Sequence, residues 1–134
     1  MNAPREPGRM LIVDDNRVNR LLLTHALEQN GHRVSTAENG KIAMEMLRGK
    51  SYDVILLDID MPVMNGFEVL EALLSDNELR DLPVVMTSAS DELDRVVKCT
   101  EMGAEDYLVK PFNPVLLRAR VNASLEKKRL RDQQ

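Results

Sequence analysis

The sequence predicts an α/β domain, a doubly wound sheet of five parallel strands with five helices, in three layers of helix, sheet and helix. Short aliphatic runs alternate strictly with segments of helical period along the chain, which argues for right-handed crossovers that place helices on both faces of one sheet. Three of the aliphatic runs are nearly all apolar, as expected for strands that are covered on both sides. The 134 residues are enough for a single domain with one core.

Five short runs rich in β-branched and aliphatic residues indicate the strands. They span residues 9–14, 33–37, 53–58, 83–88 and 106–110. Each is the length of an ordinary strand, and each is separated from the next by enough chain for a helical crossover.

Apolar residues spaced three and four apart predict a helix after each strand. The last helix is expected to begin at Pro114, with Asn113 as its N-cap. The other four helices are expected to present apolar faces formed by Val18, Leu21, Leu22 and Ala26; by Ile42, Ala43, Met46 and Leu47; by Leu70, Leu73 and Leu74, after Gly66; and by Leu93, Val96 and Val97.

The two ends of the chain differ from its middle. Residues 1–8 contain prolines and a glycine and no apolar pattern, so we expect a flexible tail before a domain that spans residues 9–125. Residues 126–134 extend the last helix. Its apolar repeat of Leu117, Val121 and Leu125 is followed by charged residues, which suggests a linker to an output domain absent from this sequence.

Composition narrows the classes of function. The formal net charge is −4, which argues against nucleic acid as a direct partner, and no helix-turn-helix follows the domain. The one cysteine, Cys99, allows no internal disulfide and fits a reducing compartment. No apolar run approaches the ~20 residues that cross a bilayer, so we expect a cytoplasmic protein without a membrane association.

Polar side chains stand where four of the predicted strands end. Asp14 and Asp15 follow the first strand, Asp58 ends the third, Ser88 ends the fourth, and Lys110 ends the fifth. In an open parallel sheet the ligand site lies outside the carboxyl ends of the strands, so the sequence predicts that these side chains form one site.

The chemistry of this set points to phosphoryl transfer. Three neighbouring carboxylates require a counter-charge, and Mg²⁺ is suited to carboxylate ligands while keeping positions open for phosphate. A lysine and a hydroxyl donor complete a site in which a carboxylate nucleophile attacks phosphorus. We therefore expect one aspartate to become an acyl phosphate.

The sequence resembles the receiver domains of two-component response regulators, from about Arg9 to Leu125. The matching blocks are "LIVDDNRVNR", "DVILLDIDMPVMNGFEVL", "PVVMTSAS" and "EMGAEDYLVKPF". The resemblance implies a flavodoxin-like sheet with strand order 2-1-3-4-5. It also implies a phosphorylation-dependent switch rather than an enzyme acting on external substrates.

The resemblance assigns a role to each site residue. Asp58 would be the phosphoacceptor. Mg²⁺, for which Mn²⁺ could substitute, would be bound by the side chains of Asp15 and Asp58 and by the backbone carbonyl of Asp60, with Asp14 acting largely through water.

A second group of residues would change state on phosphorylation. Ser88 would be the switch hydroxyl, Tyr107 the switch aromatic and Lys110 the phosphate partner, with a cis peptide bond between Lys110 and Pro111. The implied partners are a sensor histidine kinase or a histidine phosphotransfer protein. A homodimer is also expected, either through the face of the fourth helix, fifth strand and fifth helix or through the extended last helix.

The run "VVMTSAS" offers two hydroxyls for the switch position. Side chains alternate along a strand, so Thr87 and Ser88 are expected to point in opposite directions. Ser88, which is followed by the small residue Ala89 at the strand end, fits the family pattern better.

Two other functions compete with a phosphorylated switch. The first is a receiver-like interaction module that is not controlled by phosphorylation, although such modules usually lack an acid or the lysine. The second is a phosphatase similar to the haloacid dehalogenase family, whose Asp-x-Asp motif resembles Asp58 and Asp60. In that family a small hydroxyl residue follows two positions later, where this chain has Pro62, and the motif follows the first strand rather than the third.

Overall fold

A computed structural model describes residues 7–133 of the chain, so most of the predicted tail lies outside the described residues. Its elements follow in strict alternation: β1 (Arg9–Val13), α1 (Arg17–Gln29), β2 (Arg33–Ala37), α2 (Gly40–Gly49), β3 (Val54–Asp58), α3 (Gly66–Leu74), β4 (Val84–Ser88), α4 (Leu93–Met102), β5 (Asp106–Val109) and α5 (Pro114–Asp132). The predicted strands are confirmed to within a residue or two at their ends.

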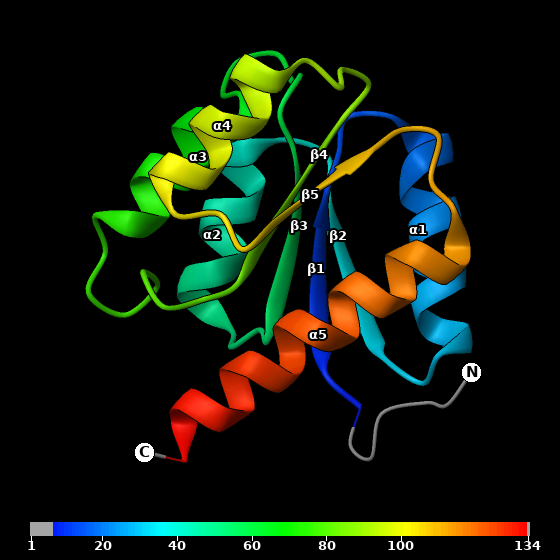
Figure 1. Cartoon of the computed structure of the whole chain (residues 1–134). Helices are drawn as coiled ribbons and strands as arrows, with labels where there is room; N and C mark the ends of the chain where they lie inside the picture. Colours follow the sequence, from blue (N-terminus) through cyan, green and yellow to red (C-terminus); the bar gives the residue numbers. More distant parts are fainter. Residues whose placement is uncertain (1–6, 134) are drawn as a thin grey trace.

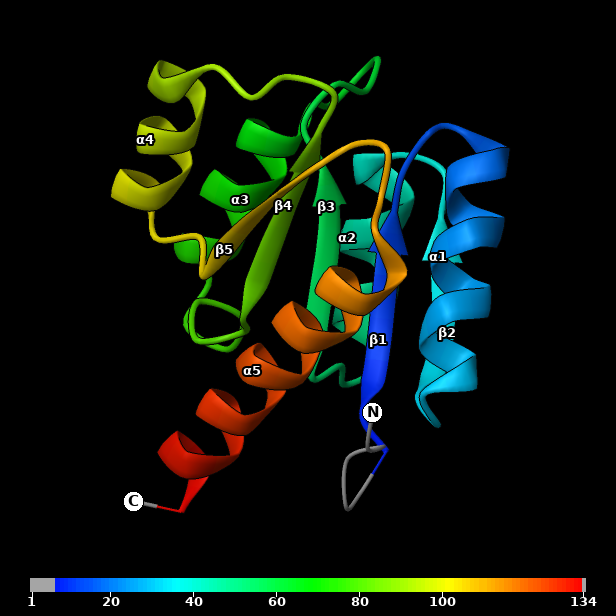
Figure 2. The same cartoon turned by 45° about the vertical axis from the view of Figure 1, so that its right-hand side comes forward.

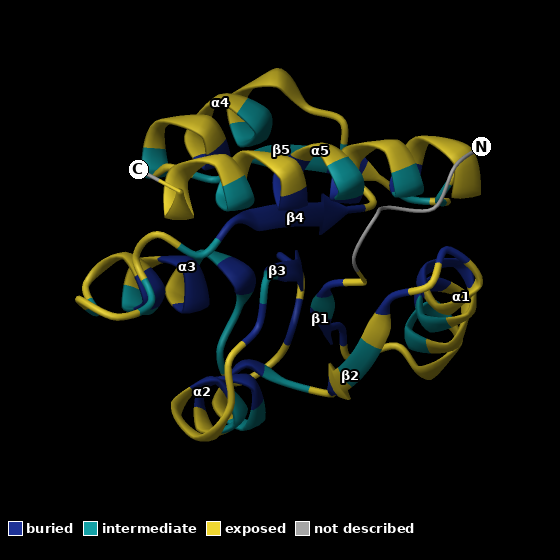
Figure 3. Ribbon diagram, turned by 90° about the horizontal axis from the view of Figure 1, so that it is seen from below, coloured by how far each residue is buried: buried dark blue, intermediate teal, exposed yellow. Residues whose placement is uncertain are grey.

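The five strands form one parallel sheet in the order β2-β1-β3-β4-β5. This is the predicted doubly wound order, with β3 in the centre (Figure 1). All residues of β3 and β4 are buried, which explains why those runs are almost wholly apolar. In Figure 3 both strands have the colour of buried residues, whereas exposed residues lie on the helices, on the loops and on the edge strand β2.

Helices cover the sheet on both faces, as predicted. On one face α1 and α5 pack against β1, β3 and β4, around a core that includes Leu27, Leu56 and Val121. On the other face α2, α3 and α4 pack against the same strands, around Leu47, Leu57 and Leu73. Figure 2 shows α1 and α5 on one side of the sheet and α3 and α4 on the other.

Asparagine side chains start four of the five helices. Asn16, Asn39, Asn65 and Asn113 each accept a hydrogen bond from a backbone N–H in the first turn. An N-cap of this kind satisfies a donor that the helix itself leaves free and contributes about 1 kcal/mol. The expected cap at Asn113, with Pro114 at the first helical position, is confirmed.

The predicted apolar face of α1 is wrong for three of its four residues, and only Ala26 is buried as predicted. Val18, Leu21 and Leu22 are 62%, 59% and 59% exposed, and the buried residues of the helix are Leu23, Ala26 and Leu27. Two apolar stripes run along this helix, and their spacing does not show which one faces the sheet. Packing against α5 and β1 decides it and leaves the second stripe in solvent.

The predicted face of α4 is wrong for a related reason. Leu93 is 73% exposed and Val97 41%, whereas Cys99 is the only fully buried residue of the helix. Cys99 packs against the core on the α2, α3 and α4 side, where a small apolar side chain fills the space.

Both ends of the described chain pack against the domain. Gly8 is buried, and its N–H donates to His32 Nδ1 at 3.0 Å, so the packed part begins at Gly8. Helix α5 continues to Asp132, where Arg131 donates to the side chain of Glu105 and to the carbonyl of Asp81. Within residues 7–133 no helix has the length and apolar character needed to cross a membrane.

Candidate functional site

Three aspartates meet at the carboxyl ends of β1 and β3. One carboxylate oxygen from each of Asp14, Asp15 and Asp58 lies within 4.8 Å of the other two. Asp14 and Asp58 are buried, whereas Asp15 is exposed. The cluster is therefore buried at the end of the sheet and open to solvent on the side of Asp15.

Lys110, which follows β5, supplies a positive charge to this cluster. Its Nζ lies 3.1 Å from Asp14 Oδ2 and 3.1 Å from Asp58 Oδ1. One cation leaves the three carboxylates with an excess of negative charge. The predicted cis peptide bond between Lys110 and Pro111 is confirmed.

The acidic cluster fits a hard divalent cation. Asp14 Oδ2 is buried and accepts no aligned hydrogen bond from the described residues, because Lys110 approaches it only as an ion-pair partner. Buried carboxylate oxygens of this kind are normally satisfied. Oxygen ligands with excess negative charge and one exposed side are what Mg²⁺ or Mn²⁺ requires.

Burial raises the pKa of Asp58 to about 6, and the negative charge of Asp14 adds to this effect, while Lys110 opposes it. For Lys110, burial alone would lower the pKa, but the charges of Asp58 and Asp14 outweigh burial and raise it. Without a bound cation, the ionised form of Asp58 is therefore less favourable than that of a free aspartate side chain.

The raised pKa of Asp58 predicts how the free energy of unfolding depends on pH and on Mg²⁺. Because the folded pKa of Asp58 lies above the value of 3.8 for a free side chain, the free energy of unfolding falls as pH rises from about 4 to about 6. At pH 7.5 without metal, Asp58→Asn should therefore raise it by about 1–2 kcal/mol, after allowing for the lost contact with Lys110.

Urea denaturation measures this change. Below about pH 4 the gain should disappear, because Asp58 is then protonated in both states. Mg²⁺ should stabilise the parent protein but not the variant. An equal response of both proteins to Mg²⁺ would contradict a metal site that includes Asp58.

Ser88, the predicted switch hydroxyl, is the last residue of β4. Ser88 Oγ lies 3.2 Å from Asp60 Oδ2, and the backbone N–H of Ser90 donates to Ser88 Oγ at 3.1 Å. Thr87 is paired in register with Asp58, and its backbone oxygen accepts the amide of Ile59. The side chain that reaches the loop after β3 is that of Ser88.

Tyr107 of β5 contacts the segment between β4 and α4. Its ring is half-buried against the core, and its hydroxyl donates to the carbonyl of Ser90 at 2.5 Å. Movement of the segment after Ser88 would therefore break or shift the hydrogen bond of Tyr107.

The sequence analysis did not identify Arg95 as a residue of this region. From the first turn of α4, Arg95 Nη1 donates to Asp60 Oδ1 at 2.9 Å and to Ser88 Oγ at 3.1 Å. No periodic signal marks this arginine, because a charged residue near the start of a helix is ordinary.

Acids and a lysine thus lie at the carboxyl ends of a parallel sheet with the order 2-1-3-4-5. Comparison with known proteins shows which family has this arrangement. The response regulator receiver domain family matches residues 10–122. The chain belongs to this family.

Several known proteins are similar to this chain over most of its length. Protein PilH of Pseudomonas aeruginosa is 39% identical over 118 residues, which cover 88% of this chain and 98% of that protein. The transcriptional regulatory protein CpxR of Escherichia coli is 42% identical over 128 residues, covering 95% of this receiver but only 53% of CpxR. The structure of the chemotaxis response regulator CheY4 of Vibrio cholerae has a TM-score of 0.83 at 31% identity, covering 89% of this chain and 99% of that one.

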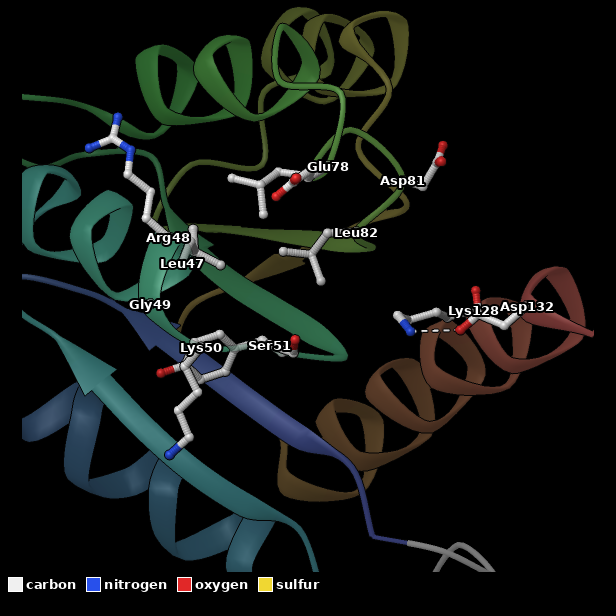
Figure 4. Close-up of a pocket in the computed structure, with 12 residues that line it drawn as sticks. Leu47, Arg48, Gly49, Lys50, Ser51, Glu78, Asp81, Leu82, Lys128 and Asp132 are labelled. Atoms are coloured by element: carbon white, nitrogen blue, oxygen red, sulfur yellow. Dashed lines mark hydrogen bonds and ion pairs between the residues drawn. The ribbon is translucent and has the colours of Figure 1, made fainter.

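A cleft of about 630 Å³ lies at the opposite end of the receiver. It is lined by residues that precede β3 and β4 and by the end of α5, where Lys128 pairs with Asp132 (Figure 4). Its lining mixes charges of both signs with leucines and contains none of the acids of the cluster. The cleft is therefore separate from the acidic cluster.

Proposed function

We propose that this receiver accepts a phosphoryl group on Asp58 from a phosphohistidine of a sensor histidine kinase or a histidine phosphotransfer protein, with Mg²⁺ bound, and that the acyl phosphate switches a partner-binding face. The observation that carries the proposal is the contact of Asp58 with both Lys110 and the other two acids at the end of the central strand. Mn²⁺ could replace Mg²⁺, since both favour oxygen ligands.

The transfer is a substitution at phosphorus. A carboxylate oxygen of Asp58 attacks the phosphorus; an O–P bond forms while the P–N bond of the phosphohistidine breaks, and the electron pair of that bond stays on the imidazole nitrogen. Lys110 Nζ, already 3.1 Å from Asp58, stabilises the charge that spreads over the phosphoryl oxygens. Mg²⁺, when bound through Asp15, Asp58 and the carbonyl of Asp60, with Asp14 acting through water, offsets the charge of the acids and of the phosphate.

The exposed stripe of α1 offers a surface for the phosphodonor. Val18, Leu21 and Leu22 project into solvent from a helix that begins two residues after Asp15, beside the acids. A small groove of about 150 Å³ lies between α1 and α5, and Leu22 and Phe112 are among the residues that line it. A helix that carries the phosphohistidine would bury these side chains while placing phosphorus at Asp58.

The output surface is the face of α4, β5 and α5. Leu93, Val97 and Val109 are exposed there, next to the switch residues Ser88 and Tyr107. We propose that phosphorylation changes the affinity of this face for a partner or for a second copy of the chain. The alternative dimer through the extended last helix, and a cytoplasmic location, stay predictions.

Incubation with acetyl phosphate and Mg²⁺ tests the proposed function. We expect mass spectrometry to find one added phosphoryl group, localised to Asp58 and lost when the acyl phosphate is cleaved by hydroxylamine. An unmodified Asp58 would instead favour the interaction module that is not controlled by phosphorylation. Steady turnover of small phosphoesters would favour the phosphatase, although Pro62 stands where that family needs a hydroxyl residue.

The assignment of the switch hydroxyl gives a second prediction. Ser88→Ala should abolish most of the spectral change that phosphorylation or beryllofluoride produces at Tyr107, because no hydroxyl then moves to the phosphate. Thr87→Ala should retain that change, since Thr87 is one residue away and its side chain points to the other side of the strand. NMR spectra of both variants, with and without beryllofluoride, provide the measurement, and the reverse result would mean that Thr87 is the switch residue.

A further inference from the structure

An ion pair connects α4 with the loop after β3, directly over the switch hydroxyl. Arg95 Nη1 donates to Asp60 Oδ1 at 2.9 Å and to Ser88 Oγ at 3.1 Å, and Ser88 Oγ lies 3.2 Å from the other oxygen of Asp60. The three side chains come from α4, the loop after β3 and the end of β4. They form a closed triangle of polar contacts, here termed the Ser88 triangle.

The contacts of Ser88 use its full hydrogen-bonding capacity. A hydroxyl has one proton to donate and two lone pairs that accept. In Ser88 the lone pairs accept from Arg95 Nη1 and from the amide of Ser90, and the proton is directed to Asp60 Oδ2. Ser88 is completely buried, so water does not offer it an alternative partner.

We infer that the Ser88 triangle is an inhibitory contact, in which Asp60, positioned by Arg95, competes with the phosphoryl group on Asp58 for the single proton of Ser88. The inference rests on the proposed function and adds two positioning residues to it. To donate to the phosphate, Ser88 must release Asp60, and a hydrogen bond from a hydroxyl to a carboxylate is stronger than one between neutral groups. Before phosphorylation the Ser88 hydroxyl is therefore already hydrogen-bonded to Asp60.

Arg95 gives this contact a second consequence, at the surface of the receiver. It belongs to the first turn of α4, and its guanidinium also stands 6.0 Å from the centre of the Phe67 ring of α3. While Ser88 and Asp60 hold Arg95, the start of α4 is tied to the site. When Ser88 Oγ moves away to the phosphate, Arg95 Nη1 loses one of its two hydrogen bonds. The position of α4 is therefore coupled to the position of the Ser88 hydroxyl.

The affinity for beryllofluoride at saturating Mg²⁺, measured by NMR titration, tests the competition. Asp60→Ala retains the backbone carbonyl but removes the competing acceptor, and we expect about three- to tenfold tighter binding. Removing a negative charge near an anion also favours binding, so the same change is made in a Ser88→Ala background. There the gain should fall to less than about twofold, because no proton is left to compete for.

A readout without any phosphoryl mimic separates this inference from the proposed function. In the metal-free parent protein, side-chain couplings should show Ser88 in a single rotamer, and in Asp60→Ala and Arg95→Met it should populate several. Lys98→Met is the matched control, because Lys98 lies one turn later on α4, over the same Phe67 ring at 4.0 Å, and is expected to leave Ser88 unchanged. Methionine keeps much of the apolar length of either side chain.

The outcomes are distinct. Equal gains from Asp60→Ala with and without Ser88 would show a charge effect alone and overturn the inhibitory contact. A single Ser88 rotamer in Arg95→Met would overturn the positioning role of Arg95. If the parent protein binds no beryllofluoride, the proposed function fails and the competition fails with it.

Discussion

Replacing Asp58 with asparagine is expected to lower phosphoryl acceptance by at least about a thousandfold, since the amide supplies neither the nucleophilic oxygen nor the negative charge of the carboxylate. The remaining acids do not replace it. Asp14 is buried and paired with Lys110, and Asp15 lies outside the end of β1. Incorporation from acetyl phosphate, followed by mass spectrometry over time, measures the loss.

Asp91→Asn is the matched control for this experiment. Asp91 is an exposed acid of the segment between β4 and α4, and its replacement removes the same charge without touching the cluster. We expect its phosphorylation to proceed at the parent rate. If Asp58→Asn accepts phosphate as fast as the control, or if the label is found on Asp14 or Asp15 in the parent protein, Asp58 is not the acceptor.

Gly66→Ala is expected to lower the free energy of unfolding by about 2–4 kcal/mol, the largest stability effect predicted for a single methyl group here. A Cβ at Gly66 would stand 2.5 Å from the carbonyl oxygen of Asp58 and 2.7 Å from Cα of Ile59. Both are backbone atoms at the end of the central strand, so they can give way only by moving β3. The same shift would displace Asp58 and weaken the binding of Mg²⁺.

A second helical glycine provides the control. Gly49 is the last residue of α2, and a Cβ there meets no atom within 4 Å. Gly49→Ala should therefore stabilise the receiver by about 0.4–1 kcal/mol, because alanine restricts the unfolded chain and favours the helix. Urea denaturation of both variants compares a methyl group in backbone contact with one in open space, and equal effects would contradict the close approach at Gly66.

The contrast between α1 and α5 shows how far helical period carries a prediction. On α5 the apolar repeat of Leu117, Val121 and Leu125 is buried, as its spacing implies. On α1 the residues from Val18 to Leu27 carry two stripes, and of the predicted face only Ala26 is buried. A helix with apolar residues on two sides has no preferred rotation until it packs against its neighbours.

The sequence by itself determined the fold class and the location of the acidic cluster. Short apolar runs such as 53–58, alternating with helical segments, indicate central strands. Parallel strands bring their carboxyl ends to one edge, so Asp14, Asp58 and Lys110 are expected to converge there. These conclusions depend on the spacing of apolar residues and on the direction of the chain, and both can be read directly from the sequence. The tertiary structure decided the rest: which stripe of α1 stays exposed, how deeply Asp58 is buried, and that Arg95 reaches Ser88 and Asp60. Each of these depends on the rotation and spacing of helices against the sheet, which are set by the packing of side chains distant in sequence.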